Sequence, residues 1–252
     1  MALIKSGNEI GTMRTSGNIL SRVVQTLLPE IAIGVSLHDL DHHAYAHIAH
    51  LGAAPAFLGY QPYGAAHKFP STLCTSVNEV VVHGLPTHRR LVEGDILTID
   101  IGAKYRGYYS DMAVTVGIGA ISEQAQRLID VTREALNRAI LVATPNHTLG
   151  DVGHAVSQYV TGNGFVIVKG LTGHGIGTEL HEEPSVLNEG TPGRGMRLQP
   201  GMVLAIEVMT SAGSPHIIKN KFDEYETSDS ALSAHFEHTV AITEGEPEVL
   251  TK

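Results

Sequence analysis

The sequence predicts an α+β fold in which a central antiparallel sheet has helices on its outer face and a pseudo-twofold axis relates two halves. The segments 91–100 and 198–207 share the pattern Leu-x-x-Gly-x-apolar-Leu-x-Ile-acid. The segments 111–116 and 237–242 share a second pattern, acid-x-small-Val-x-apolar. Two helices are expected before the strands in both parts of the chain. Because a duplication explains this shared order, we expect a single domain over residues 1–252, with halves at about 1–120 and 121–252.

The first half is expected to begin with two helices and to continue into strands. Ser6 and Glu9 have the spacing of a capping box, which predicts a helix that begins after Ser6 and ends at Pro29. Ser36 is the expected N-cap of a second helix, which runs to about Gly52. Strands are expected near residues 80–82, 96–101 and 112–116.

The second half is expected to repeat this order. Ser122 is the expected N-cap of a helix whose apolar positions recur at helical spacing from Ala125 to Ala139. Thr148 is the expected N-cap of the next helix, and the residues after Ser36 and Thr148 share the pattern Leu-x-Asp-apolar. Strands are expected near residues 165–168, 202–208 and 237–242.

Composition and charge narrow the class of protein. The 252 residues carry a net charge of -9, which is unfavourable for general binding to DNA or to acidic membranes. A single cysteine, Cys74, excludes an intrachain disulfide and is typical of a reducing compartment. No apolar run approaches the ~20 residues of a membrane span, and the first residues lack the apolar segment of a signal peptide. We therefore expect a cytoplasmic protein without membrane or DNA partners.

Two acids flank a turn between predicted strands. If this turn centres between Tyr105 and Arg106, Asp100 and Asp111 lie directly opposite each other in an antiparallel pair. Carboxylates ~5 Å apart repel each other and stay ionised only when a cation lies between them. The alternative for both residues is a solvated strand end beside a turn, where aspartate is common.

Glu207 and Glu237 repeat the arrangement in the second half. Burying a lone carboxylate at the end of an apolar strand is costly, so four of them indicate one shared site. Two divalent cations balance four carboxylates, which favours a dinuclear metal centre over a mononuclear one.

Fifteen histidines are available to complete such a site. His174 differs from the others because glycines on both sides let other backbone approach it closely. His181 follows seven residues later, and His83 ends an apolar strand. For either of these two alone, a hydrogen-bonded structural role is the alternative. The helical spacing places three further residues on what we expect to be a solvated helix face: His43, His47 and His50.

Together these motifs resemble a known family. Residues 78–86 read Asn-Glu-Val-Val-x-His-Gly-x-Pro, residues 173–177 read Gly-His-Gly-Ile-Gly, and residues 181–184 read His-Glu-Glu-Pro. With the candidate ligands in the order Asp, Asp, His, Glu, Glu, the chain resembles a type I methionine aminopeptidase over nearly its whole length. The resemblance implies the pseudo-twofold "pita-bread" fold, which agrees with the duplication.

The resemblance also implies roles for these residues. The metal ligands of two divalent ions (Co, Mn, Fe(II) or Zn) would be Asp100, Asp111, His174, Glu207 and Glu237. Glu207 would also act as general base and acid, and His83 and His181 would contact the substrate and assist catalysis. The implied reaction is removal of the N-terminal methionine from nascent proteins and peptides by attack of metal-activated water, with a preference for a small second residue.

A pocket for the methionine side chain is implied as well. Its lining would be Cys74 and upstream aromatic residues, which match best at Phe57, Tyr60 and Phe69. The segment 61–68 is longer than the family pattern, so either Tyr60 or Tyr63 takes the pocket position. Leu180 stands where an aromatic residue is expected. Because the chain has no tryptophan, Tyr225 is the candidate to cover the pocket.

Two other functions remain alternatives. An X-Pro aminopeptidase or prolidase would use the same ligands but typically carries a large N-terminal domain, for which the predicted helix after Ser6 leaves no room. A non-catalytic binding module on this fold tends to lose ligands, whereas all five are present here. The expected partners are peptides with a free N-terminal methionine and nascent chains, and the expected state is a monomer. The acidic net charge disfavours tight contact with ribosomal RNA, so a transient ribosome contact would need a local basic patch such as that around Arg89 and Arg90.

Overall fold

The computed structural model of the protein describes residues 3–61 and 67–252. Its described helices are α1 (Gly7–Leu27), α2 (Leu37–His50), α3 (Glu123–Val142) and α4 (Leu149–Gly162), with a 3-10 turn, η1 (Leu28–Glu30), after α1. Within this part of the chain, no helix has the length and apolarity needed to cross a membrane.

Most strands belong to one antiparallel sheet. The order along this sheet is β1 (Ala54–Pro55), β4 (Ile96–Tyr105), β5 (Tyr108–Gly117), β12 (Ser233–Ala241), β9 (Val203–Ser211), β7 (Gly173–Gly175) and β8 (Glu182–Val186). Three more strands pair beside this path, namely β2 (Leu73–Val77) with β4, β6 (Val166–Ile167) with β9, and β13 (Glu248–Val249) with β12. A separate small sheet has the order β10 (Ile217–Lys219), β11 (Tyr225–Thr227) and β3 (Val80–Val82).

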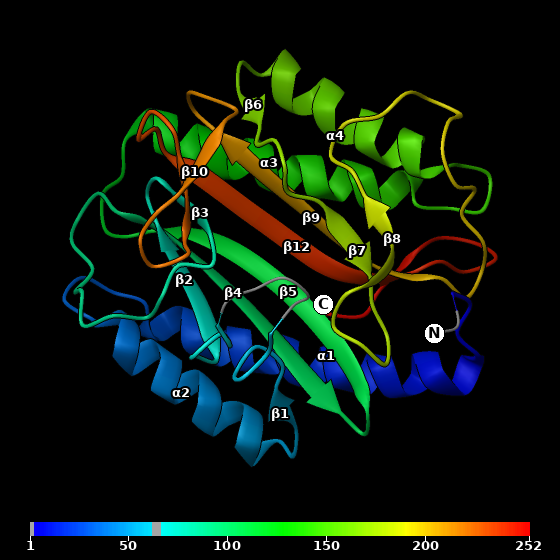
Figure 1. Ribbon diagram of the computed structural model, residues 1–252, viewed down its shortest axis with the longest axis horizontal. Coiled ribbons are helices and arrows are strands. Elements are labelled where there is room, and N and C mark those ends of the chain that lie inside the picture. The colour runs from blue at the N-terminus through cyan, green and yellow to red at the C-terminus, as the bar shows by residue number, and fades with distance from the viewer. Residues whose placement is uncertain (1–2, 62–66) are drawn as a thin grey trace.

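The four helices lie in two pairs beside this sheet. In the view of Figure 1, α1 and α2 lie below the long central strands, and α3 and α4 lie above them. Helix α1 packs on β4 and β5, while α3 packs on β9 and β12. The two strand groups meet where β12 pairs with β5 on one side and with β9 on the other. The predicted α+β class with helices against an antiparallel sheet is therefore confirmed.

The predicted helix starts are also confirmed. The hydroxyl of Ser6 accepts a hydrogen bond from the backbone N–H of Glu9, whose carboxylate in turn accepts one from the N–H of Ser6. The hydroxyls of Ser36 and Ser122 accept hydrogen bonds from the backbone N–H groups of Asp39 in α2 and Ala125 in α3, and Thr148 forms a second capping box. These side chains satisfy N–H groups that the first turn of a helix leaves free.

Strand periodicity separates the core from the functional face. Ile99 and Ile101 of β4 belong to the apolar core beneath α1 and α2. Ile206 and Val208 of β9 belong to the core beneath α3. Because neighbouring side chains of a strand point to opposite faces, the acids between these residues project from the face away from the helices.

The predicted register of the β4–β5 hairpin is wrong. Its turn is the two-residue loop Arg106-Gly107, both with positive φ (47° and 89°), so Tyr105 pairs with Tyr108. Positive φ at both positions is what a tight type I′ turn requires, and glycine supplies it readily. Asp100 therefore faces Ala113, and Asp111 faces Gly102. A shift of two positions keeps both acids on one face, where they are diagonal neighbours.

Candidate active site

Four acids converge at the centre of the sheet. Asp111 and Glu237 are buried, with exposed fractions of 3% and 2%, while Asp100 and Glu207 are partly buried. Glu237 lies directly opposite Glu207 across the β9–β12 pair and opposite Ala113 across the β5–β12 pair. Strand β12 therefore brings the acids of both halves of the chain together.

Within the described residues, protein groups do not provide hydrogen bonds to all the carboxylate oxygens of these acids. Within the described structure, three of their buried oxygens have no hydrogen-bond partner: Asp100 Oδ1, Asp111 Oδ1 and Glu237 Oε1. Burial raises the pKa of Asp100 to about 7. Burial first, and then the neighbouring carboxylates, raise the pKa of Asp111 and Glu237 well above the ordinary range. Ionising these carboxyls together is unfavourable unless a cation compensates their charge. Their unpartnered oxygens are available to bind such a cation.

His174 completes a ligand group with these acids. One ligand atom each from Asp111, His174 and Glu237 lies within 4.8 Å of the others. The Nδ1 of His174 is 2.9 Å from the carbonyl oxygen of Gly175, so the Nδ1–H donates there and Nε2 keeps its lone pair. Burial lowers the pKa of His174 to about 4, so the ring is neutral and able to bind a metal.

The glycines on both sides of His174 allow the close approach of other backbone that the sequence predicts. A Cβ atom on Gly173 would come within 2.4 Å of the carbonyl oxygen of Ala205 on β9. One on Gly175 would come within 2.2 Å of the carbonyl oxygen of Glu183. Because any larger residue would force the strands apart, the glycines hold β7 close enough for His174 to reach the acids.

His181 and His83 lie on the walls above the acids. The rings of His174 and His181 are 4.4 Å apart between centroids, and Nδ1 of His181 is 2.6 Å from the hydroxyl of Tyr60. His83 adopts a left-handed backbone with φ of 62°, which is costly for a residue with a side chain and is concentrated at functional sites. The ring of Tyr225 contacts it at a centroid distance of 5.4 Å.

A cavity of about 1120 Å³ opens over this cluster. Its lining includes all five candidate ligands, both accessory histidines and the predicted pocket residues Phe57, Tyr60, Phe69 and Cys74. Leu180 and Tyr225 line it too. The rings of Phe57 and Phe69 meet edge to face at 6.4 Å. Tyr63, the alternative to Tyr60, lies outside the described residues.

Cys74 lines the cavity and does not have the properties of a nucleophile. It pairs with Asp100 across the β2–β4 ladder and is buried. Burial, followed by the negative charges of Asp100 and Asp111, raises the pKa of its thiol well above the ordinary value. The thiol therefore stays protonated at neutral pH, as expected for an apolar pocket residue and not for a nucleophile.

The histidines of α2 lie at the protein surface and are distant in sequence from the cluster of acids. His43 and His50 are exposed and His47 is partly exposed, as predicted. An acid lies beside them, because Glu30 of η1 accepts a hydrogen bond from His43 and lies 3.9 Å from Nε2 of His47. Within the described residues, these three side chains do not form a group whose ligand atoms all lie within 4.8 Å of one another.

Sequence reasoning missed two buried polar features of the site. His235 lies on β12 two residues before Glu237, and strand alternation alone places it on the same face. Lys5 and Glu182 form a buried ion pair, with Nζ 2.6 Å from Oε2, directly beside His181. No local pattern connects residues 177 positions apart, so only the fold reveals this pair.

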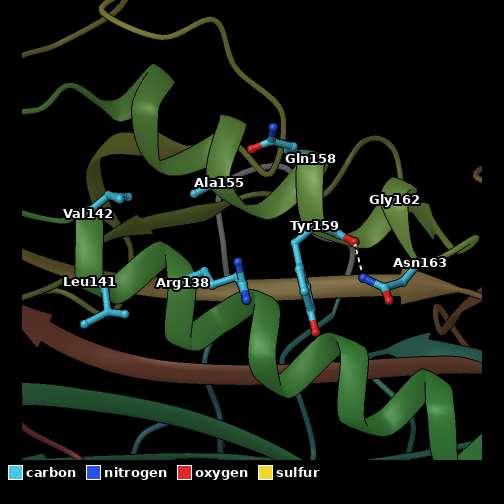
Figure 2. A pocket seen from close by; sticks show the side chains of 8 residues that line it. All are labelled: Arg138, Leu141, Val142, Ala155, Gln158, Tyr159, Gly162 and Asn163. Carbon is cyan, nitrogen blue, oxygen red and sulfur yellow. Dashed lines mark hydrogen bonds between the residues drawn. The ribbon is translucent and has the colours of Figure 1, made fainter.

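A second hollow lies between α3 and α4 (Figure 2). It has a volume of about 520 Å³, and its lining comprises Arg138, Leu141, Val142, Ala155, Gln158, Tyr159, Gly162 and Asn163. The guanidinium of Arg138 stacks 4.1 Å from the ring centroid of Tyr159 and also pairs with Glu134. This lining contains no acid and no histidine, so the hollow offers neither metal ligands nor a general base.

Comparisons with known proteins agree with this site. Residues 11–244 match the metallopeptidase family M24. The chain is 42% identical to methionine aminopeptidase 1 of Bacillus subtilis (strain 168), over 100% of both chains. It is 44% identical to a methionine aminopeptidase of Clostridium perfringens, over 100% of this chain and 99% of that protein.

Solved structures give the same result. A methionine aminopeptidase from Thermotoga maritima superposes with a TM-score of 0.95 at 40% identity, covering 100% of both chains. A prolidase from Pyrococcus furiosus has a TM-score of 0.79 at 24% identity and is covered over 65% of its length, so it shares the fold. The chain therefore belongs to the metallopeptidase family M24, among its methionine aminopeptidases.

Proposed function

We propose that this protein hydrolyses the first peptide bond of peptides and nascent proteins that begin with methionine, preferring a small second residue. The observation that carries the proposal is the cluster of four acids and His174 on the floor of a cavity with an apolar wall. The identity of 42% and 44% to two methionine aminopeptidases, over 99–100% of each chain, supports the same reaction.

The centre is proposed to hold two divalent ions. Their ligands would be Asp100, Asp111, His174, Glu207 and Glu237. The unpartnered carboxylate oxygens and the free Nε2 of His174 support this assignment. The oxygen-rich set suits Co, Mn, Fe(II) or Zn. When bound, such ions lower the pKa of water and polarise the substrate carbonyl.

Glu207 is proposed to move the proton. Its carboxylate is less buried than that of Glu237, with 13% of its side chain exposed against 3%, so it can reach the reacting groups. Burial, and then the charge of Asp100, raises its pKa well above the ordinary range, which suits a group that accepts and releases a proton. It would take a proton from the attacking water and deliver it to the leaving amine.

The two accessory histidines are proposed to bind the substrate backbone. The hydroxyl of Tyr60 lies at Nδ1 of His181, and burial raises the pKa of this phenol, which therefore keeps its proton and donates it. The Nε2–H of His181 is then free to stabilise the carbonyl oxygen as charge develops there. His83, which lines the same cavity, would bind the scissile amide nitrogen.

The apolar end of the cavity is proposed to select methionine. Phe57, Tyr60, Phe69 and Cys74 would surround the methionine side chain, since a thioether packs well against aromatic rings. A prolidase-type specificity is the weaker candidate, because the similarity to prolidases is limited to the shared fold. The presence of all five candidate ligands weighs against a binding module without catalysis.

The wider context is also proposed. We expect a single catalytic domain over residues 1–252 with related halves, acting as a monomer in the cytoplasm. Transient ribosome contact near Arg89 and Arg90 would have to compete with internal partners. Arg89 pairs with Asp95, and Arg90 donates to the carbonyl oxygen of Gly34.

Peptide cleavage by metal-stripped protein, with and without added Mn(II) or Co(II), tests the proposed function. The panel is Met-Ala-Ser, Leu-Ala-Ser and Ala-Pro-Ser. Metal-dependent release of methionine alone is the expected result. Cleavage of Ala-Pro-Ser would instead assign a proline-directed activity, and no cleavage with metal bound would favour a binding module.

A further inference from the structure

His235 is a buried histidine that the proposed mechanism does not use. Only 1% of the residue is exposed, and within the described structure neither ring nitrogen has a hydrogen-bond partner. Burying a polar group without a hydrogen-bond partner is unfavourable, so such a group calls for an explanation. The imidazole of His235 is thus a buried polar group that needs a hydrogen-bond partner.

The backbone of His235 is held firmly. Its N–H donates to Oγ1 of Thr115 on β5, and the same hydroxyl donates back to the carbonyl oxygen of His235. Its neighbours Ala234 and Phe236 pack in the core beneath α3. The position of the ring is therefore fixed by the sheet, on the face that also carries Glu237.

The ring points at two of the candidate ligands. Its Nε2 is 3.6 Å from Oε2 of Glu207 and 3.9 Å from Oε2 of Glu237. On the other side of Glu207, Nε2 of His174 is 3.7 Å from Oε1. The carboxylate of Glu207 therefore lies between two imidazoles, each facing one of its oxygens.

The two imidazoles differ at their second nitrogen. Nδ1 of His174 donates to a carbonyl oxygen, which leaves Nε2 as a lone pair for a metal. Nδ1 of His235 has no such acceptor, whereas two carboxylate oxygens lie near its Nε2. When a cation keeps Glu207 ionised, its carboxylate accepts hydrogen bonds and does not donate them. In that state the proton of a neutral His235 ring belongs on Nε2.

We propose that His235 is a positioning residue that donates its Nε2–H to Oε2 of Glu207 and so turns Oε1 toward His174 and the metal. This inference rests on the proposed metal centre. Closing the 3.6 Å separation to an ordinary hydrogen bond of ~2.8 Å requires a shift of less than one ångström. Such outer-shell partners of metal ligands are typically worth 10–100-fold in metal affinity or activity.

Co(II) titration of metal-stripped protein by calorimetry, together with the visible absorption spectrum of the bound Co(II), tests this role. In H235L we expect Co(II) affinity to fall 10–100-fold and the spectrum to change, because the Glu207 carboxylate loses its orientation. In H235Q the amide Nε2–H can replace the ring donor, so we expect affinity within about threefold of the wild type. For methionyl peptides, kcat should fall in H235L with little change in KM and recover in H235Q.

A neighbouring histidine provides the control. His238 lies on the same strand but on its other face, where Nδ1 pairs with the hydroxyl of Thr251. H238L should lower the melting temperature while leaving Co(II) affinity and spectrum unchanged. If H235L fails to fold, H235F replaces it, because it keeps an aromatic ring without nitrogen.

Two results would overturn the proposal. Unchanged Co(II) affinity and spectrum in H235L or H235F would reduce His235 to a packing residue. A loss in H235Q as large as in H235L would mean that the donor N–H is not what matters. If the wild type binds Co(II) but cleaves no methionyl peptide, the proposed function fails while the metal-binding test of His235 still stands.

Discussion

The two halves of the sheet bring equivalent acids to the cavity with different neighbours. Asp100 and Asp111 are diagonal across the β4–β5 hairpin, and the thiol of Cys74 lies opposite Asp100. Glu207 and Glu237 are directly opposed across β9 and β12, and two imidazoles flank Glu207. The repeated backbone pattern thus supplies charge in both halves, whereas the two imidazoles that face Glu207, those of His174 and His235, both come from the second half. We infer that the first half mainly holds metal and the second half also moves protons.

The largest effect should come from the acid between the two imidazoles. In Glu207→Gln we expect kcat to fall by about 10²–10⁴-fold, the range of general acid–base catalysis, while much of the bound metal is retained. Steady-state kinetics and metal analysis of the same preparation check this. Glu134→Gln, on the exposed surface of α3, is the matched control and should behave like the wild type. Turnover of Glu207→Gln at the wild-type rate would show that the base is another residue.

The next largest effect concerns the buried ion pair that joins the N-terminal segment to the second half of the chain. Lys5→Met leaves Glu182 buried without its cation, so we expect a loss of about 3–5 kcal/mol in the free energy of unfolding. Arg14→Met breaks the exposed pair with Glu248 and should cost at most about 1 kcal/mol. Denaturant unfolding of both variants provides the comparison. Equal stability of the two variants would contradict the importance of the buried pair.

The acids of both halves predict an unusual pH dependence for the metal-free protein. Burial raises the pKa of Asp100 to about 7, above its value in the unfolded chain, so the folded state binds more protons between about pH 4 and 7. This carboxyl therefore contributes stability that is fully present below the window and is lost as the pH rises through it. The buried His174 and His235, whose pKa values burial lowers, act in the opposite direction, so the contribution of Asp100 is measured by difference. In a chelator, the melting temperature of Asp100→Asn relative to the wild type should be roughly 5 °C more favourable at pH 8 than at pH 5.

Added metal should remove this pH effect. A cation compensates the ionised carboxylates, and any ligand that binds only the folded state raises its stability. The melting temperature at pH 8 should therefore rise on addition of Mn(II) or Co(II). If Asp100→Asn and the wild type differ in melting temperature by the same amount at pH 5 and pH 8, burial does not raise the pKa of this acid.

The smallest predicted effect tests the link between the halves at His181. Tyr60→Phe removes the hydroxyl 2.6 Å from Nδ1 of His181, and we expect kcat/KM to fall about tenfold, or ~1.4 kcal/mol. Tyr45→Phe, an exposed tyrosine of α2, is the control and should not change kinetics. If Tyr60→Phe cleaves Met-Ala-Ser as fast as the control, His181 does not depend on this contact.

The sequence patterns predicted the helix starts and the helix-then-strand order well. Capping residues act within one turn, so Ser6, Ser36, Ser122 and Thr148 reveal their helices locally. The duplicated strand patterns also identified the four acids and their common face. Strand periodicity is robust here, because a register error of two positions left Asp100 and Asp111 on the same side.

The remaining features depend on contacts between distant segments. The short strands β7 and β8 were not predicted, because the glycines of β7 and the proline of β8 hide their strand character. The ion pair of Lys5 with Glu182 and the place of His235 between two acids arise only when the sheet has formed. Lys5 and His235 lack a motif of their own, so their roles follow from geometry.

Metal titration during catalysis tests the central claim most directly. Metal-stripped protein is mixed with Met-Ala-Ser, and methionine release is followed as Co(II) or Mn(II) is added in known ratios to the chain. We predict no release without metal, a rise on addition, and saturation by two ions per chain. Release at full rate in the presence of excess chelator, or binding of metal without any release of methionine, would contradict the account.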